Sequence, residues 1–275
     1  GPAEQGRGFG PTMVIDKGVS AAAFRDLLRT GAPFVRWWKL GFGTAALYPP
    51  QLVQQKVARG RRLGVEVYVG GTFLELARVQ GQLEAALQAL ARLSVRWVEI
   101  SDGTFPMAAP QRERLIQQVA AMGFHVLTEV GSKREGMPWE ASRTADQVAR
   151  DLACGAAWVL IEARDSGRGV GVFDSQGRLC RDRVEQLVAA LEREGVDLGR
   201  VVWEAPLPEQ QKELLLWFGP GVALGNVQVT DILQLAAMRA GLRSDTLRAW
   251  WQPGRNPAPS VDGGPAQRVI SNQVK

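Results

Sequence analysis

Acidic residues follow four successive apolar stretches of this sequence in the same way. The segment VRWVEISDG places Glu99 and Asp102 after a hydrophobic run, and Glu129, Glu162 and Glu204 follow the next three runs. One acid in such a place is most often a solvated loop residue, but the repetition over four runs argues against that reading. Carboxylates gathered in one place repel one another unless cations lie among them. The pattern therefore predicts an acidic site with bound or neighbouring cations.

The other potential metal ligands are scarce, and this limits the kind of metal. The chain has one histidine, His125, and two cysteines, Cys154 and Cys180, with no CxxC motif. A multi-histidine zinc site and a disulfide framework are therefore excluded, and a reducing cytoplasm is the expected location. Carboxylate oxygens suit a hard ion such as Mg2+. The predicted metal ligands are the five acids Glu99, Asp102, Glu129, Glu162 and Glu204. His125 begins an apolar run rather than ending one, so we expect it to be structural.

Basic and polar residues follow the same apolar runs. Lys17, Lys39, Lys133 and Arg164 each come shortly after or at the end of one, and Asn226 ends the last. The glycine-rich loop SGRGVG after Glu162 offers backbone N–H groups and a guanidinium to an oxyanion such as phosphate. Its predicted anion-binding residues are Ser166, Gly167, Arg168 and Gly169. Such a loop is weak evidence when it stands alone.

Eight short apolar runs alternate with segments of helical periodicity, which must position these residues. The expected strands cover residues 12–18, 34–43, 64–71, 95–103, 125–133, 156–164, 200–206 and 222–227, and expected helices include 50–64, 81–94, 111–123 and 182–195. This alternation predicts an α/β protein with a single (β/α)8 TIM barrel, in which all strand carboxyl ends meet at the active-site face.

A doubly wound open sheet is the alternative fold, but its dinucleotide fingerprint is missing. The segment GRGVG resembles that fingerprint, yet VFDSQGRLC follows it and is typical of a hairpin rather than a helix. The predicted barrel spans residues 12–251. Residues 1–11 are expected to form a flexible arm, and the Pro- and Gly-rich residues 252–275 a disordered tail.

The charge pattern narrows the class of partner. The formal net charge is +5, but the basic residues are dispersed and no basic run is paired with an aromatic platform. We therefore expect small anionic substrates rather than nucleic acid. No apolar run reaches the 18 or so residues that a membrane helix needs, so no membrane association is expected.

Eight motifs occur in the order found in phosphosulfolactate synthases, and the sequence resembles that family from Thr12 to Thr246. The motifs are MVIDKG, KLGFGTAALYP, VYVGGTFLE, VEISDGT, LTEVGSK, VLIEARDSGRGVGVFD, WEAP and GLRSDT. The resemblance implies a (β/α)8 barrel and Mg2+-dependent addition of sulfite to phosphoenolpyruvate, which gives (2R)-3-phosphosulfolactate. This product leads to coenzyme M in methanogens and to sulfolactate in some bacteria.

The resemblance also implies roles for individual residues. A lysine protonates the reaction intermediate, and Lys133 is the first candidate, with Lys17 and Lys39 in reserve. Ser132 stands where the family commonly has the first of two lysines. Arg243, in GLRSDT, joins Arg164 as a candidate substrate ligand.

Two alternatives to the synthase remain open at this stage. One is a barrel of this family that has lost the reaction and serves as a binding or stress-related protein. The other is a related Mg2+ enzyme that acts on another enolic phosphate. The oligomeric state is also open, a homo-oligomer included.

Overall fold

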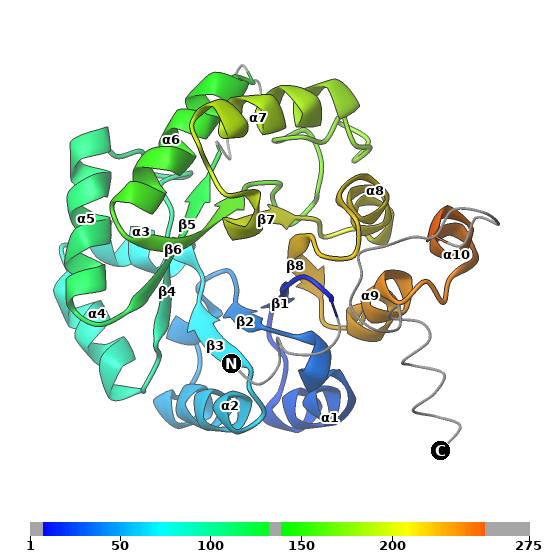
Figure 1. The fold of residues 1–275 in the computed structure, drawn as a ribbon. Coiled ribbons are helices and arrows are strands. Elements are labelled where there is room, and N and C mark those ends of the chain that lie inside the picture. Colours follow the sequence, from blue (N-terminus) through cyan, green and yellow to red (C-terminus); the bar gives the residue numbers. More distant parts are fainter. Residues whose placement is uncertain (1–7, 132–138, 251–275) are drawn as a thin grey trace.

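The protein forms a closed barrel of eight parallel strands, β1 to β8, which pair in chain order (Figure 1). The computed structural model describes residues 8–131 and 139–250. The strands are β1 (Thr12–Asp16), β2 (Trp37–Leu40), β3 (Glu66–Val69), β4 (Trp97–Ile100), β5 (His125–Val130), β6 (Ala156–Ile161), β7 (Val201–Glu204) and β8 (Ala223–Gln228). The predicted TIM barrel is confirmed, and the open-sheet alternative is wrong because β8 pairs with β1.

Helices surround the barrel and cover its outer face (Figure 1). They are α1 (Ala21–Gly31), α2 (Pro50–Arg62), α3 (Gly71–Val79), α4 (Leu83–Arg92), α5 (Ala109–Ala121), α6 (Ala141–Ala153), α7 (Arg181–Arg193), α8 (Pro208–Phe218), α9 (Ile232–Arg239) and α10 (Ser244–Trp250). Three short 3-10 helices, η1 (Ala32–Phe34), η2 (Thr44–Ala46) and η3 (Leu198–Arg200), complete the described elements. Strands covered on both faces explain the nearly continuous apolar runs in the sequence.

Seven of the eight observed strands end before the expected carboxyl ends, and only β8 runs one residue further, to Gln228. The run 95–103 contributes only Trp97–Ile100 to β4, because the polar residues that follow turn away from the ladder. There the Ser101 hydroxyl accepts the Gly103 N–H, and the Asp102 carboxylate accepts the Met107 N–H. The expected hairpin after the glycine loop is present, with an antiparallel bridge between Phe173 and Leu179.

Aromatic side chains fill the amino-terminal end of the barrel. Trp37 packs edge-on against both Trp97 and Trp158, with ring centroids 5.5 and 5.2 Å apart. His125 lies over Trp97 at 4.7 Å. His125 begins β5 at the end of the barrel opposite the acidic residues, where a structural residue was expected.

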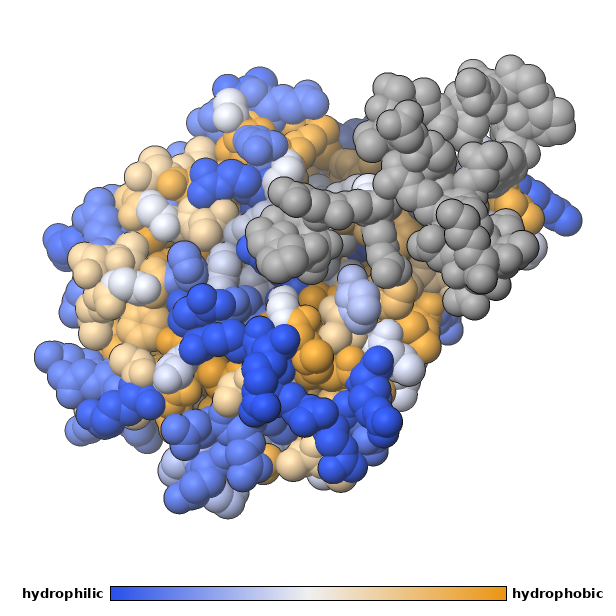
Figure 2. Space-filling view, turned by 60° about the horizontal axis from the view of Figure 1, so that its bottom comes forward, coloured by the Kyte–Doolittle hydropathy of each residue, from blue (hydrophilic) through white to orange (hydrophobic). Residues whose placement is uncertain are grey.

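The outer surface mixes polar and apolar residues. The face in Figure 2 shows hydrophilic side chains interspersed with hydrophobic ones. Within the described residues, no helix combines the length and the apolar character needed to cross a bilayer.

Candidate active site

Lys39 lies among buried carboxylates inside the barrel. Its Nζ atom is 2.9 Å from Glu99 Oε1 and 3.5 Å from one oxygen each of Glu129 and Glu204. All four side chains are buried. They come from β2, β4, β5 and β7, so the closed barrel brings together residues that are up to 165 positions apart. The sequence-based expectation that cations lie among the acids is met here by Lys39.

Glu99 is held by two further donors. The Tyr68 hydroxyl donates to Oε2 at 2.9 Å, and the Gly71 N–H donates to Oε1 at 2.7 Å. Burial and the neighbouring Glu99 raise the pKa of Tyr68 well above its usual range, so Tyr68 stays protonated as a donor. Groups of the protein itself therefore compensate the charge of Glu99. This favours a role for Glu99 as the ion-pair partner of Lys39 rather than as a metal ligand.

Two of these carboxylates, Glu129 and Glu204, also form a group with Glu162 that could hold a metal ion. Glu129, Glu162 and Glu204 each place a carboxylate oxygen within 4.8 Å of the others, and all three are buried. Glu162 directly follows β6, where it fits closely against Gly131 of the preceding loop. A side chain at position 131 would place its Cβ 2.7 Å from the Cβ of Glu162, and Gly131 has a φ of 137°. Glycine is therefore needed at that bend.

Charge and burial together shift the protonation of this site. Burial, with smaller contributions from Glu129 and Glu99, raises the pKa of Glu204 to about 7 against the lowering effect of Lys39. Burial lowers the pKa of Lys39, but Glu99, Glu204 and Glu129 outweigh burial and raise it well above its usual value. Lys39 is therefore a permanent cation at neutral pH. An additional cation at the group of three glutamates would favour the ionised form of Glu204.

Ser101 and Glu75 connect the site to the loop after β4, and sequence reasoning did not assign them a role. The Ser101 hydroxyl lies 2.9 Å from Glu129 Oε1 and 2.8 Å from Glu75 Oε1. The second oxygen of Glu75 accepts the N–H groups of Thr104 and Phe105. Tyr68 was not predicted as a site residue either. Its place could have been inferred from strand register, because Tyr68 of β3 pairs with Lys39 of β2.

Asp102 does not join the three glutamates, so its assignment as a metal ligand is not supported. Its Oδ1 atom is 2.7 Å from Arg112 Nη1, and its Oδ2 atom accepts the Met107 N–H. Arg112 is itself buried and donates to Asp151 and to the Glu129 carbonyl. The sequence placed Asp102 near the strand end correctly, but α5 supplies an arginine that binds it there.

The glycine-rich loop uses some of the N–H groups that were expected to bind an anion. The Gly169 N–H donates to the Asp174 carbonyl at 2.8 Å, and the Gly167 N–H to the Arg164 carbonyl at 3.4 Å. Ser166 lies in the turn that the second bond closes, and Arg168 follows directly after it. Arg164 has a positive φ of 59°, and its N–H donates to Glu162. The expectation of free amides at Gly167 and Gly169 is therefore corrected, because the turn that begins at Arg164 uses the first and the hairpin uses the second.

The remaining predicted residues fall in different places. Asn226 is buried on β8, and its side-chain oxygen has no hydrogen-bond partner within the described protein. Lys17 lies at the rim, 3.7 Å from Asp165, with 36% of its side chain exposed. Arg243 lies beside Met238 and Asp245, after a helix that runs back from the carboxyl end of β8. Its expected place at the active-site mouth is corrected for that reason. Lys133 and Ser132 lie outside the described residues.

A cavity of about 550 Å3 opens beside Glu162, between the loop after β4 and helices α5 and α6. Its wall combines the acids Glu162, Asp102 and Glu140 with four arginines. Arg112 and Arg150 already form ion pairs with acids, so Arg143 and Arg183 are the side chains that suit an anionic ligand next to the carboxylates. The basic residues that line it are Arg112, Arg143, Arg150 and Arg183.

Gly71 leaves no room for a larger residue beside the site. An alanine Cβ there would lie 2.5 Å from Ser101 Cβ and 3.2 Å from Glu99 Oε1. We expect Gly71→Ala to destabilise the protein by about 1–3 kcal/mol, the usual range for overpacking, and to lower turnover at least tenfold. Thermal melts and steady-state kinetics measure both effects. Gly221→Ala is the matched control, since its Cβ would meet nothing within 4 Å. Equal behaviour of the two variants would contradict the expectation.

The sequence is similar to a family of known activity. The family model described as "(2R)-phospho-3-sulfolactate synthase (ComA)" matches residues 2–245. A phosphosulfolactate synthase from Methanothermobacter thermautotrophicus is 38% identical over 240 residues, which are 86% of this chain and 91% of the relative. One from Methanocaldococcus jannaschii is 35% identical, over 86% of this chain and 93% of the relative. One from Bacillus subtilis is 29% identical, over 87% and 93%.

Solved structures share the fold at low sequence identity. The YdjI aldolase from Escherichia coli K12 superposes with a TM-score of 0.54 at 14% identity, over 85% of this chain and 80% of that one. A 3-hexulose-6-phosphate synthase gives 0.52 at 13% identity, over 82% and 98%. These likenesses support the TIM barrel and carry no information on the reaction.

Proposed function

The chain belongs to the phosphosulfolactate synthase family, and we propose that its site joins sulfite to phosphoenolpyruvate. The observation that carries this proposal is the group of buried carboxylates around Lys39 at the carboxyl ends of the strands. Buried acids with one central cation form a preorganised electrostatic site, which suits a reaction whose charge moves between oxygen atoms. The product would be (2R)-3-phosphosulfolactate.

We propose Glu129, Glu162 and Glu204 as the residues that hold Mg2+. Their donors are all carboxylate oxygens, the ligand type that a hard divalent ion prefers, and they lie within reach of one ion. A bound Mg2+ would neutralise negative charge that develops on the carboxylate of the substrate. Glu99 lies outside this group and serves instead to hold Lys39 through the 2.9 Å ion pair.

The reaction needs no nucleophile from the protein. The sulfur lone pair of sulfite forms a bond to the methylene carbon, and the electrons of the carbon–carbon double bond move toward the substrate carboxylate. A proton then adds to the neighbouring carbon, while the phosphate ester remains intact. Lys39 would stabilise the added negative charge, because its ammonium group is buried and permanently protonated. Of the three candidate proton donors, Lys39 suits the role least, because it holds its proton too tightly, so we propose Lys133, with Lys17 as the alternative.

Arginines near the group of three glutamates would bind the anionic ends of the substrates. Arg164 lies two residues after Glu162, and the cavity beside Glu162 carries further guanidinium groups. Guanidinium binds phosphate or sulfonate oxygens in a bidentate manner. We propose that the phosphate of phosphoenolpyruvate lies on this side of the site, with Asn226 as a polar contact from β8.

The experiment that tests this proposal measures the 31P signal of the substrate and how the rate of its conversion depends on sulfite. Incubation with phosphoenolpyruvate, sulfite and Mg2+ should convert the enol phosphate signal in 31P NMR to that of an alkyl phosphate, at a rate that depends on sulfite. Binding of phosphoenolpyruvate without conversion would favour the binding-protein alternative. Conversion without sulfite, or only with a different enolic phosphate, would favour another Mg2+ enzyme.

Removal of divalent metal should abolish the reaction. The proposed ligands are acids that repel one another, and Lys39 offsets only part of their charge. We expect activity after exhaustive chelation to fall by a factor of about a hundred or more, and Mg2+ or Mn2+ to restore it. The measurement is the initial rate before and after metal is added back. Full turnover of a protein shown to be metal-free would refute the metal role.

A further inference from the structure

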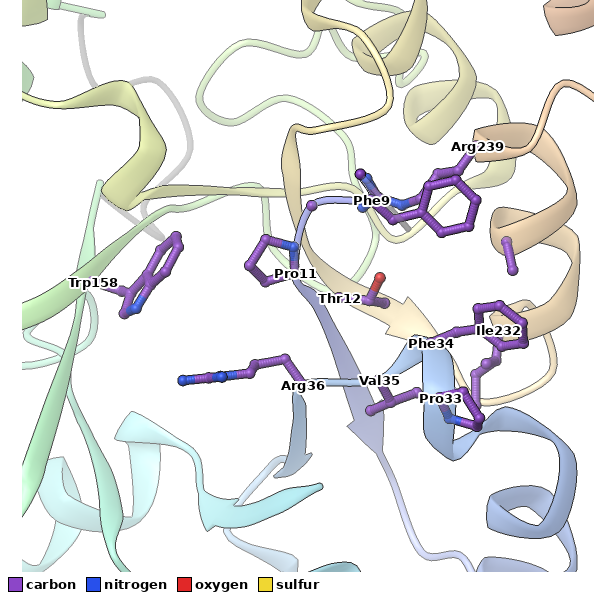
Figure 3. Close-up of a pocket in the computed structure, with 13 residues that line it drawn as sticks. Phe9, Pro11, Thr12, Pro33, Phe34, Val35, Arg36, Trp158, Ile232 and Arg239 are labelled. Carbon is purple, nitrogen blue, oxygen red and sulfur yellow. The ribbon is translucent and has the colours of Figure 1, made fainter. Parts of the chain in front are cut away.

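A second cavity lies at the opposite end of the barrel from the carboxylates. It has a volume of about 220 Å3 and lies between the start of β1, the segment around η1, and helix α9. In Figure 3, Arg239 reaches into this region from α9 beside Phe9, and Arg36 extends from the start of β2 toward the side where Trp158 lies. Nothing in the proposed reaction uses this cavity.

Arg239 has only part of its hydrogen-bonding capacity satisfied. The residue is 2% exposed, and its Nη1 atom donates to the backbone carbonyls of Pro220 and Val222. Its Nε and Nη2 atoms are buried and have no hydrogen-bond partner among the described residues. The N–H groups of Nε and Nη2 lie along one edge of the planar guanidinium and point the same way. That edge matches the two oxygens of a carboxylate.

No acid among residues 8–131 and 139–250 forms an ion pair with Arg239. The same part of the chain buries three other basic side chains, and each of them faces a buried carboxylate: Lys39 faces Glu99, Lys56 faces Asp16, and Arg112 faces Asp151. None of the described residues that line the cavity around Arg239 is acidic. Burial lowers the pKa of Arg239 to about 9, still above neutrality, so the group is charged when the protein works. A buried charge without a partner is costly, and a bound anion would relieve that cost.

The rest of the cavity wall is mostly apolar. Phe34, Trp158, Ile232 and Ala236 line it together with prolines, and Arg36 adds a second basic side chain. Apolar cavities of about 150 Å3 are known to hold a single benzene ring, so this volume fits one ring with a small substituent. An inorganic ion alone would leave the apolar wall without contacts.

We propose that this cavity binds a small organic carboxylate, with its two oxygens on Nε and Nη2 of Arg239 and its apolar body against Phe34 and Ile232. The site is distinct from the carboxylate group, because Arg239 contacts the chain just before β8, at the amino ends of the strands. The proposal does not depend on the synthase reaction.

Thermal melts with small probes test this assignment. We expect benzoate to raise the melting temperature of the wild-type protein by about 3 °C or more at saturation, as a ligand of the folded state does. Benzamide, which has the same shape without the charge, should give no comparable shift. Arg239→Met should remove the response to benzoate. Ala236→Met, which fills the cavity but keeps the guanidinium, should weaken it at least tenfold in concentration.

The controls separate this site from others. If Arg239→Met does not fold, Ala236→Met decides, together with the Nε–H resonance of Arg239 in 15N NMR, which should shift with benzoate in the wild type only. An equal response of wild type and Ala236→Met, an equal response to benzamide, or no response at all would overturn the proposal. A response to inorganic phosphate that matches the response to benzoate would also overturn it, because the site would then be a simple oxyanion site.

Discussion

Lys39→Met should lower kcat/KM by a factor of about a thousand or more and destabilise the protein by about 3–5 kcal/mol. Both effects follow from its place among the buried carboxylates of Glu99, Glu129 and Glu204. Removal of one member of a buried ion cluster leaves the others uncompensated. Loss of a preorganised charge beside the reacting atoms accounts for the loss of rate. Steady-state kinetics and urea melts, each at several Mg2+ concentrations, measure the two effects, and added Mg2+ should recover part of the stability.

Lys56→Met is the matched control for this experiment. Lys56 is another buried lysine, and its Nζ lies 2.6 Å from the buried Asp16, outside the cluster around Lys39. The Lys56→Met variant should lose a similar free energy of unfolding, but it should keep most of its turnover at temperatures below its melting point. If the two variants lose activity in parallel, the effect of Lys39 is structural. Near-normal turnover of Lys39→Met would reject its proposed role altogether.

Glu204→Gln should raise the Mg2+ concentration for half-maximal activity by a factor of about a hundred or more. Glu204 is one of three carboxylates that could hold the ion, and the amide keeps an oxygen for the Ala163 N–H while the charge is lost. Magnesium binding depends strongly on the number of charged ligands. Titration of activity with Mg2+, and calorimetry of Mg2+ binding, provide the measurement.

The same variant should change how stability depends on pH in the metal-free protein. Because the pKa of Glu204 is raised from 4.5 to about 7 in the folded state, folded protein holds a proton that unfolded protein releases in this range. The contribution of Glu204 to stability is therefore fully present below about pH 4.5 and is lost as pH rises through 7, by on the order of 3 kcal/mol. Glu204→Gln should lack this loss. A wild-type protein that gains stability from pH 5 to 8 would contradict the assignment.

Asp102→Asn is the control for the metal experiment. The carboxylate of Asp102 is used by Arg112 and by the Met107 N–H, so its loss should cost some stability. It should leave the Mg2+ requirement unchanged. A shift as large as that of Glu204→Gln would place Asp102 in the metal site after all.

The sequence predicted the barrel because the spacing of the apolar runs, and their alternation with helical segments, are enough to define this fold. Eight apolar runs separated by helical segments leave few other topologies, and the strand ends then fix which residues share one face. That reasoning brought Glu129, Glu162 and Glu204 to one place, together with Lys39. It could not decide which acids are already paired within the protein.

Which acid forms an ion pair depends on basic side chains from other elements, and the pattern of apolar runs does not specify where those side chains lie. Asp102 and Glu99 stand three residues apart in one motif, yet Arg112 from α5 binds the first and Lys39 from β2 the second. Arg243 was misplaced for a related reason, since a motif gives order along the chain and not the end of the barrel to which a short helix returns. Arg239 could not be recognised at all, because its lack of a partner is a property of the packed structure.

The contacts of Lys39 also have a consequence for the order of events in folding. They join β2 to β5 and β7 across 90 and 165 positions of sequence, and such distant residues meet only when the ring of strands has nearly closed. Contacts of this kind are weakly formed in a transition state that consists mainly of neighbouring βα units. The charged centre would then contribute little to how fast the chain folds and much to how slowly the finished barrel opens. The residues proposed for the reaction would thus also slow unfolding and lengthen the lifetime of the native state.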